Sequence, residues 1–565
     1  MMKQILVGAA LLGLAACGNT ASKVELPPEA ASATRAAVTQ GELVGFVAAN
    51  GSHVWRGVPF ASDTSGKNRW RAPRPAPNWE GVREAINFAP VCPQIATPFT
   101  PIESFTNGQL EGSEDCLAMD IYAPADAKGK SLPVMLWIHG GSNVSGASQL
   151  YVGENLANNE NVIVMSVQYR LGPLGWFSHP DLKETAATPE DATANFGTLD
   201  LIAALKWAKD NAASFGGNPD NVTIFGESAG GHNVATLLAS PLAEGLFHRA
   251  IIQSGGFDSI TIEEAQGKTG EQPNPSLEVT KRLGGSENFH TASLQEVFEA
   301  YELDEGGFMD LPRIVQDGVV LPEGTLRNAF SSMETFNAVP VMSGINKDEM
   351  KLFYLFDERL TKAKFGKFYV ARDQDFYDAA SEYSSRIWRV RSVDMPLTMM
   401  GEAGHEDVYA YRFDWDEGGK ILWMDLSKML GAAHSLEIPF VLNRFKLLGD
   451  ADGIMFKKKT LATRDVLSRS MGAYWAAFAR NGQPNNADLP NWPAYGSSSS
   501  VMYFDSTNDR GIRAEDGADS FAKITADLKS DTRLDSAQRC EIADGLKQWI
   551  PTLETALKMI EACES

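Results

Sequence analysis

The stretch Val222-Thr-Ile-Phe-Gly-Glu-Ser-Ala-Gly230 decides the fold. Its first four residues form an apolar run rich in β-branched side chains, which is typical of a strand buried on both faces. Its last five residues place Ser228 between small neighbours, and Gly231 to Leu238 then reads as a helix. A strand, a turn of small residues and a helix predict a nucleophile elbow that exposes the serine hydroxyl. The five-residue pattern alone is weak, and its place after a strand makes Ser228 a candidate nucleophile.

Further apolar runs of the same kind predict a mostly parallel central sheet flanked by helices, an α/β fold. The predicted strands cover 133–138, 162–167, 222–225, 250–252, 339–343 and 408–413, and a helix covers 199–209. Polar loops at 139–146, 226–230, 344–349 and 431–437 follow four of the strands. Ligand sites in such sheets lie beyond the carboxyl ends of strands, so these loops are expected to converge on one edge.

A serine hydroxyl needs a base to take its proton, and the chain has 8 histidines. His434 follows the last predicted strand in a glycine-bearing loop, as the order serine, acid, histidine requires. His405 precedes that strand and so lies at its opposite edge, while His232 follows the elbow by one helical turn and is expected to face solvent or pack on the helix. His434 is therefore the predicted base.

The predicted acid that orients His434 is Glu349, in the loop after the preceding strand. Asp348 is the alternative, and whichever of the two is not the acid is expected to be a surface charge. The His139-Gly-Gly stretch allows close approach of backbone amides to an oxyanion, so Gly141, Ser142 and Ala229 are candidate donors. A structural glycine turn is the other interpretation of that stretch.

Together these residues resemble the type-B carboxylesterase family, the carboxylesterase/lipase group that includes cholinesterases. The likeness covers about Gly41 to Tyr503. It rests on Trp55-Arg-Gly-Val-Pro-Phe-Ala61, Trp79-Glu-Gly-Val-Arg83, Cys92-Pro-Gln94, Glu114-Asp-Cys-Leu117, Tyr169-Arg-Leu-Gly-Pro-Leu-Gly175, Phe215-Gly-Gly-Asn-Pro219 and Gly226-Glu-Ser-Ala-Gly-Gly231.

The resemblance implies an α/β-hydrolase fold with helical cap insertions and hydrolysis of small to medium carboxylic esters through an acyl-serine intermediate. No cofactor and no metal are implied. The implied residues are the triad Ser228, Glu349 and His434, the oxyanion region Gly140, Gly141, Ser142 and Ala229, the supporting Glu227 and Ser254, and the disulfide Cys92–Cys116.

This chain departs from the family where Ser142 and Asn143 replace a third glycine and an aromatic residue, and where Met350 replaces a glycine. The departures predict a more polar acyl pocket. The loop between the paired cysteines lacks the tryptophan with which cholinesterases bind a quaternary ammonium, and its aromatic residues are Phe99 and Phe105. Choline esters are therefore not the expected substrates.

The insertions 256–337 and 351–406 interrupt the strand order and are expected to form a helical cap over the site. Their aromatic residues are candidates to line it, although each alone is more often a core residue. They are Phe298, Tyr301, Phe308, Phe353, Tyr354, Phe356 and Trp388. The alternatives are a lipase or another acyl hydrolase such as a thioesterase or amidase, and a non-catalytic binding module, which typically loses a triad member.

The first residues resemble the signal of a bacterial lipoprotein. A short basic start precedes an apolar run of 12 residues from Ile5 to Ala16, whereas a spanning helix needs about 20. Leu14-Ala-Ala-Cys17 resembles a lipobox, which implies a signal peptide at 1–16, a lipid at Cys17 and a flexible tether over 17–40. The expected location is the periplasm of the bacterial cell envelope, as an outer-membrane lipoprotein, or outside the cell if Cys17 is not acylated.

The charge of the chain is −22, from 50 basic and 72 acidic residues, so nucleic acid and anionic headgroups are expected to be repelled. The lipid is then the only predicted membrane contact, and the oligomeric state is left open. Beyond the catalytic body at 41–535, Cys540 and Cys563 would lie about 35 Å apart on one straight helix. They can bond only across a bend, so Pro551 predicts a C-terminal helical hairpin at 536–565.

Overall fold

The computed structural model describes residues 28–97, 106–303, 309–310, 314–366, 368–447 and 452–550. They belong to two compact units. The serine unit, which contains Ser228, comprises the described residues of Thr20–Val341 with Gly472–Pro484. The histidine unit, which contains His434, comprises the described residues of Met342–Met471 and Asn485–Ser565.

The serine unit is built on seven strands in the order β12-β11-β9-β10-β8-β4-β3. Strands β9 to β12 are parallel to one another, while β8, β4 and β3 pair in antiparallel fashion. The predicted strands at 133–138, 162–167, 222–225 and 250–252 are confirmed, and their apolar runs are buried on both faces. The bounds are β3 (Phe46–Val47), β4 (His53–Pro59), β8 (Ala118–Ala123), β9 (Leu132–Ile138), β10 (Ile163–Val167), β11 (Gly217–Glu227) and β12 (Arg249–Gln253).

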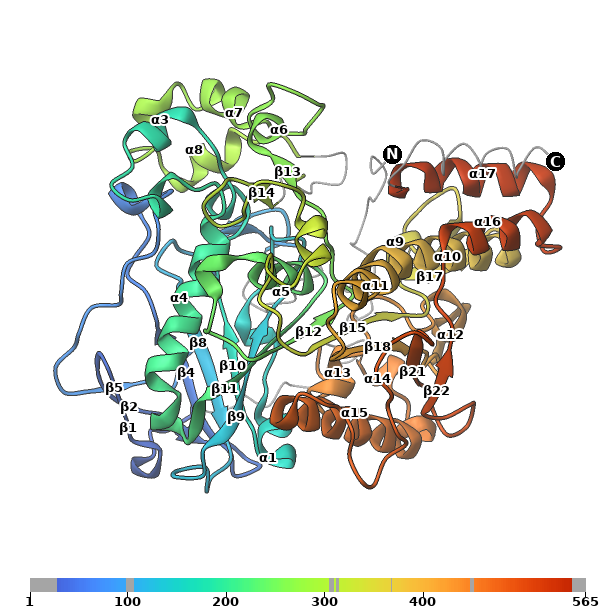
Figure 1. Ribbon diagram of the computed structural model, residues 1–565, viewed down its shortest axis with the longest axis horizontal. Coiled ribbons are helices and arrows are strands. Elements are labelled where there is room, and N and C mark those ends of the chain that lie inside the picture. Colours follow the sequence, from blue (N-terminus) through green and yellow to red (C-terminus); the bar gives the residue numbers. More distant parts are fainter. Residues whose placement is uncertain are drawn as a thin grey trace. The chain divides into compact units, whose positions relative to one another are not determined.

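The strand register brings three loops to one edge of this sheet. Gly226 on β11 pairs with Ile138 on β9, and Glu227 pairs with Gln253 on β12. The residues that follow these strand ends are therefore neighbours: Ser228, His139 and Ser254. Helices α4 (Phe196–Asn211) and α5 (Ala229–Ala239) pack against β11, and α4 runs alongside the strands in Figure 1.

The main sheet of the histidine unit has four strands in the order β15-β18-β21-β22. They are β15 (Val341–Asn346), β18 (Val408–Phe413), β21 (Ser500–Phe504) and β22 (Arg513–Asp516). β15 begins two residues later than the predicted 339–343, because Pro340 has no backbone N–H to donate to a ladder. Helices α10 (Gln374–Arg389), α16 (Phe521–Ser530) and α17 (Ser536–Leu546) lie side by side (Figure 1). Helix α15 (Leu461–Asn481) has residues in both units.

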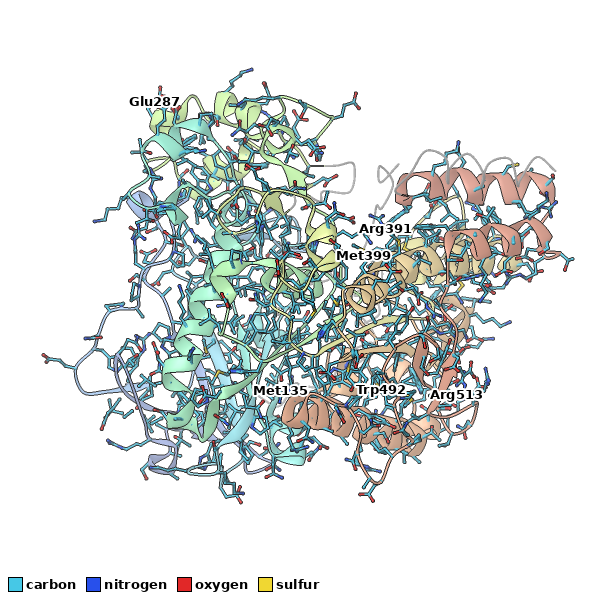
Figure 2. All side chains as sticks on the ribbon, in the orientation of Figure 1. Met135, Glu287, Arg391, Met399, Trp492 and Arg513 are labelled. Atoms are coloured by element: carbon cyan, nitrogen blue, oxygen red, sulfur yellow. A yellow bond between two sulfur atoms is a disulfide. The ribbon has the colours of Figure 1, made fainter. Side chains whose placement is uncertain are left out.

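The insertion at 256–337 consists of short helices and a small parallel ladder, β13 (Ile260–Thr261) with β14 (Val315–Gln316). The helices are α6 (Ile262–Gln266), α7 (Ser276–Arg282) and α8 (Leu294–Glu299). Phe298 and Tyr301 are buried in the core with Trp70 and Phe196, and Phe298 also lines a cavity with Val144 and Ser145. Figure 2 shows the contrast between the interior, where Met135 of β9 lies, and the surface of this insertion, where Glu287 points outward.

The insertion at 351–406 was expected to be helical, but it also includes a β-hairpin. Strands β16 (Thr361–Lys364) and β17 (Phe368–Ala371) pair in antiparallel fashion between α9 (Lys351–Tyr354) and α10. In β16 exposed lysines alternate with small residues, so the sequence shows the apolar face of neither a strand nor a helix. The hairpin therefore could not be predicted from this pattern. Helix α11 (Met395–Glu402) completes the insertion.

The predicted tether ends earlier than residue 40. Thr34 is buried, its hydroxyl oxygen accepts a hydrogen bond from the Gly45 amide at 2.8 Å, and its carbonyl accepts one from Trp55 Nε1 at 2.7 Å. Strand β1 (Ala36–Val38) then pairs with β2 (Gly41–Val44). The segment from residue 32 is therefore part of the folded serine unit.

The predicted disulfide between Cys92 and Cys116 is confirmed. Cys540 in α17 is also disulfide-bonded, and its predicted partner Cys563 lies outside the described residues, as do Pro551, Cys17 and the signal peptide. Phe99, Phe105 and Phe308 lie outside them as well. Among the residues that are described, no helix is both long and apolar enough to cross a membrane.

Candidate active site

Ser228 occupies the turn between β11 and α5, in a backbone conformation that serine rarely adopts. Its φ is 58° and its ψ is −122°. A Cβ at Gly226 would lie 2.6 Å from the Ile138 carbonyl oxygen, and one at Gly230 would lie 2.0 Å from that same oxygen. The two glycines are therefore required by the close approach of β9 and its following loop, and they leave the Ser228 side chain partly exposed at the sheet edge.

The loop from His139 to Gly146 lies directly against Ser228. A Cβ at Gly140 would lie 2.7 Å from the Glu227 carbonyl oxygen and 3.1 Å from Ser228 Cβ, and Gly141 has a φ of 97°. Within the described part of the chain, the amides of Gly140, Gly141, Ser142 and Ala229 donate no hydrogen bond. Backbone donors thus remain available to a ligand next to the serine hydroxyl.

Side chains from three other segments brace this loop. Gln94, fully buried beside Cys92, accepts from the Gly146 amide and donates to the Gly146 carbonyl, both at 2.9 Å. The Asn143 side-chain oxygen accepts from Asn233 at 2.9 Å and from the Tyr169 hydroxyl at 3.3 Å. Because these partners are rigidly packed, the loop geometry is set before any ligand arrives.

His139 is buried, and burial lowers its pKa to about 4. Its Nδ1 lies 2.9 Å from the Gly140 carbonyl oxygen. At neutral pH it is an uncharged part of the loop.

In the histidine unit, His434 and Glu349 form a buried pair. Nδ1 of His434 lies 2.5 Å from Oε2 of Glu349, and the side chains are 6% and 0% exposed. The other carboxylate oxygen of Glu349 accepts from the Asn346 amide at 2.7 Å. Two donors therefore fix the carboxylate, and the carboxylate fixes the imidazole ring.

Asp348, the alternative acid, has different partners. It is 7% exposed, and its carboxylate accepts from the Ala432 amide at 3.1 Å and lies 3.2 Å from Lys351 Nζ. The expectation that the remaining carboxylate is a surface charge is therefore wrong. Asp348 is buried because it holds the loop before His434, where Gly431 leaves room for it: a Cβ there would lie 2.4 Å from Asp348 Oδ2.

Sequence reasoning missed Asn346 and Glu437 as contributors to this site. The Asn346 side chain donates to Glu437 Oε2 at 2.6 Å and to the Ala433 carbonyl at 2.9 Å. Asn346 and Glu437 are both buried. Asn346 thus connects the acid loop to the histidine loop, and its place three residues before Glu349 was the only signal in the sequence.

Aromatic residues of the second insertion cover the imidazole of His434. The ring centroids of Phe353 and Trp388 lie 5.4 and 5.0 Å from it. These two of the predicted lining residues lie at the histidine, whereas Phe356 packs on Tyr369 and the Tyr354 hydroxyl contacts Ser384. An apolar cover limits the access of water to the imidazole.

The remaining predicted residues occupy supporting places. Glu227 is buried below Gly140, and Ser254 is buried at the end of β12 with a φ of 47°. His232 Nε2 lies 2.7 Å from the Asp258 carbonyl oxygen, and His405 is buried. Across the described ranges, no group of three or more His, Cys, Asp or Glu residues could hold a metal ion.

Comparison with known proteins places the chain in a family. The description of the matching family is "Carboxylesterase family", and the match covers residues 32–393 and 361–520. Para-nitrobenzyl esterase of Bacillus subtilis (strain 168) is 33% identical over 483 residues, which cover 79% of this chain and 89% of that protein. Liver carboxylesterase of Sus scrofa is 33% identical over 539 residues, which cover 86% of this chain and 90% of that protein.

Solved structures show the same likeness. The carboxylesterase EST55 of Geobacillus stearothermophilus at pH 6.8 matches with a TM-score of 0.67 and 30% identity, over 87% of this chain and 99% of that chain. The chain therefore belongs to the carboxylesterase family, has the α/β-hydrolase fold with a mostly parallel sheet flanked by helices, and is a serine carboxylic ester hydrolase.

Proposed function

We propose that Ser228, His434 and Glu349 are the catalytic triad of this esterase and that it forms an acyl-serine intermediate. The observation that carries the proposal is Ser228 itself, held in a left-handed elbow against a loop with unused amides. The Glu349–His434 pair supports it, because an imidazole whose Nδ1–H donates to a carboxylate presents Nε2 as a base.

In the proposed reaction, Nε2 of His434 takes the Ser228 proton as Oγ forms a bond to the ester carbonyl carbon. The carbonyl oxygen becomes an oxyanion, which the amides of Gly140, Gly141 and Ala229 stabilise, with Ser142 as a further donor. Loss of one such donor typically costs about 3 to 4 kcal/mol of transition-state stabilisation. His434 then gives the proton to the departing alcohol, and a water that it activates cleaves the acyl-serine bond.

Small to medium carboxylic esters are the proposed substrates. Ser142 and Asn143 add polar side chains to the loop beside Ser228, and Phe353 and Trp388 place an apolar surface beside His434. A polar residue beside the nucleophile suits an ester with a short acyl chain, and apolar rings beside the imidazole suit an ester that carries an apolar group.

The test is hydrolysis of p-nitrophenyl esters from acetyl to palmitoyl by the mature chain, beside Ser228→Ala. We expect the fastest turnover with short acyl chains and none above background in the variant. Turnover that survives in Ser228→Ala would exclude this serine as the nucleophile, and a maximum at palmitoyl would indicate a lipase. Labelling of Ser228 by an organophosphate separates a narrow-specificity enzyme from a non-catalytic binding protein.

We further propose that the chain is exported and acylated at Cys17, on the resemblance of Leu14-Ala-Ala-Cys17 to a lipobox. Growth with a labelled fatty acid should label the wild-type chain and leave Cys17→Ser unlabelled. If neither chain is labelled, Cys17 is not acylated, and an ordinary secretory signal is the alternative.

A further inference from the structure

Two neighbouring hairpins of the histidine unit expose large apolar side chains at their tips. One is β16–β17, and the other pairs β19 (Lys420–Ile421) with β20 (Met424–Asp425). Phe365 is 79% exposed, Leu422 is 63% exposed and Trp423 is 47% exposed. The rings of Phe365 and Trp423 stack at 5.0 Å, and Phe368 meets Trp423 edge to face at 6.0 Å. We call Phe365, Phe368, Leu422 and Trp423 the tip patch.

Local folding does not account for these residues. Phe365 and Leu422 have φ values of 52° and 49°, a left-handed conformation that turns usually give to glycine or asparagine. A polar residue would serve the turn better and would leave no apolar surface in water. The two tips therefore carry apolar side chains against the preference of both the turn and the solvent.

Both hairpins of the tip patch carry exposed lysines, although the chain as a whole has a charge of −22. From Leu360 to Ala371 the sequence contains no Asp or Glu, and Lys362 and Lys364 of β16 are exposed. At the second hairpin Lys420 is exposed, with Asp425 as its acidic neighbour at 4.0 Å. Lys457 Nζ donates to the Lys420 carbonyl at 2.8 Å, which brings the run Lys457 to Lys459 to the same hairpin.

We propose that the tip patch docks on the surface of an anionic lipid bilayer. Trp and Phe side chains enter the interfacial region, and lysines beside them bind anionic headgroups. Two protruding tips need no complementary groove when the partner is a deformable lipid surface. A second copy of this chain would instead bring the same exposed lysines against those of the first.

This inference goes beyond ester hydrolysis and does not depend on a lipid at Cys17. It also revises the expectation that the net charge repels anionic headgroups, because that expectation averages over a surface on which the basic residues are locally concentrated. The hairpins would orient the histidine unit toward the bilayer.

The test uses the full mature chain with Cys17→Ser, so that no acyl chain contributes. Sedimentation is measured with vesicles of equimolar phosphatidylcholine and phosphatidylglycerol and with vesicles of phosphatidylcholine alone. We expect binding to the anionic vesicles, and Phe365→Ser with Trp423→Ser should raise the lipid concentration for half-maximal binding about tenfold or more. Lys362→Glu, Lys364→Glu and Lys420→Glu together should have an effect at least as large.

Matched controls remove exposed residues elsewhere. Val47→Ser with Val466→Ser changes side chains that are 47% and 44% exposed, and Lys128→Glu, Lys183→Glu and Lys206→Glu repeat the charge change on other exposed lysines. None of these positions belongs to the proposed active site, so an unchanged rate of p-nitrophenyl acetate hydrolysis shows that each variant is folded.

Equal binding to both vesicle types, or an equal loss in the controls, would overturn the proposal. So would a dimer that forms without lipid and dissociates in the Phe365→Ser, Trp423→Ser variant, because the patch would then be an interface between copies.

Discussion

His434 and Glu349 are joined by a hydrogen bond of 2.5 Å between Nδ1 and Oε2, and both side chains are buried. Asp348 is adjacent in sequence to Glu349, yet it bonds Lys351 and the Ala432 amide instead. Two carboxylates that are adjacent in sequence thus contact different parts of the loop that contains His434. The glutamate holds the imidazole, and the aspartate holds the backbone that presents it.

Replacing these carboxylates by their amides should therefore have different results. Glu349→Gln removes the charge that orients and stabilises the imidazolium, so we expect kcat to fall by about 10³-fold to 10⁴-fold. Asp348→Asn keeps the acceptor for Ala432 and should lower thermal stability while leaving kcat within about tenfold. Steady-state kinetics and thermal melting of both variants make the comparison. A larger loss of kcat in Asp348→Asn would assign the acid role to Asp348.

Asn346 is expected to be a positioning residue. Asn346→Ala removes the donors to Glu437 and Ala433, so the acid and histidine loops lose one of the contacts that join them. We expect kcat to fall about tenfold to a hundredfold with KM little changed, since substrate is not contacted.

The control for this prediction is Asn485→Ala, which removes a bond to the Trp492 carbonyl in the same unit. It should reduce stability without lowering the turnover of the folded enzyme. If both variants lose kcat equally, the effect of Asn346 is only structural.

The elbow glycines should not tolerate even one methyl group. In Gly230→Ala the new Cβ would lie 2.0 Å from the Ile138 carbonyl oxygen, so we expect a loss of about 3 kcal/mol in stability and almost no activity. Gly401→Ala on helix α11, where no atom lies within 4 Å of the new Cβ, should be neutral or slightly stabilising. Soluble yield, melting temperature and esterase rate distinguish the two, and a fully active Gly230→Ala would contradict the packing argument.

Sequence could predict what depends on local order along the chain. The elbow and the strands β9 to β12 follow from a residue's place relative to a strand end, and so does the position of Glu349 in the loop after β15. Contacts between distant segments could not be predicted: Asn346 meets Glu437 across 91 positions, and the burial of Asp348 depends on Lys351 and Gly431. The predicted tether extends to residue 40 because nothing in the local sequence indicates the hydrogen bond that Trp55 Nε1 donates to the Thr34 carbonyl.

Asp120 provides a prediction for pH. Burial raises its pKa from 3.8 to about 6, although Ser148 and the Gly57 amide donate to the carboxylate. Between these values the folded protein keeps a proton that the unfolded chain has released, so stability falls as pH rises from 4 through 6. Across this pH interval the free energy of unfolding should fall by about 3 kcal/mol.

Asp120→Asn keeps the acceptor for the Gly57 amide, and its NH2 group can donate to the Ser148 hydroxyl oxygen, without a titrating group. It should match the wild type near pH 4 and exceed it in melting temperature at pH 7.5. Melting curves at both pH values make the test, and parallel curves would show that Asp120 does not titrate in this range.

The loop beside the nucleophile also determines how such an enzyme can diversify. Gly140 is closed to any side chain by the Glu227 carbonyl, and Asn143 is tied to Tyr169 and Asn233. Ser142 alone is exposed, and with a φ of 55° it adopts a left-handed conformation that disfavours serine by about 1 kcal/mol. Selection for higher stability would favour glycine at position 142. Selection for esters with a different acyl group would favour other side chains there. Evolution can therefore change the side chain at position 142 without disturbing the packing of the rest of the loop.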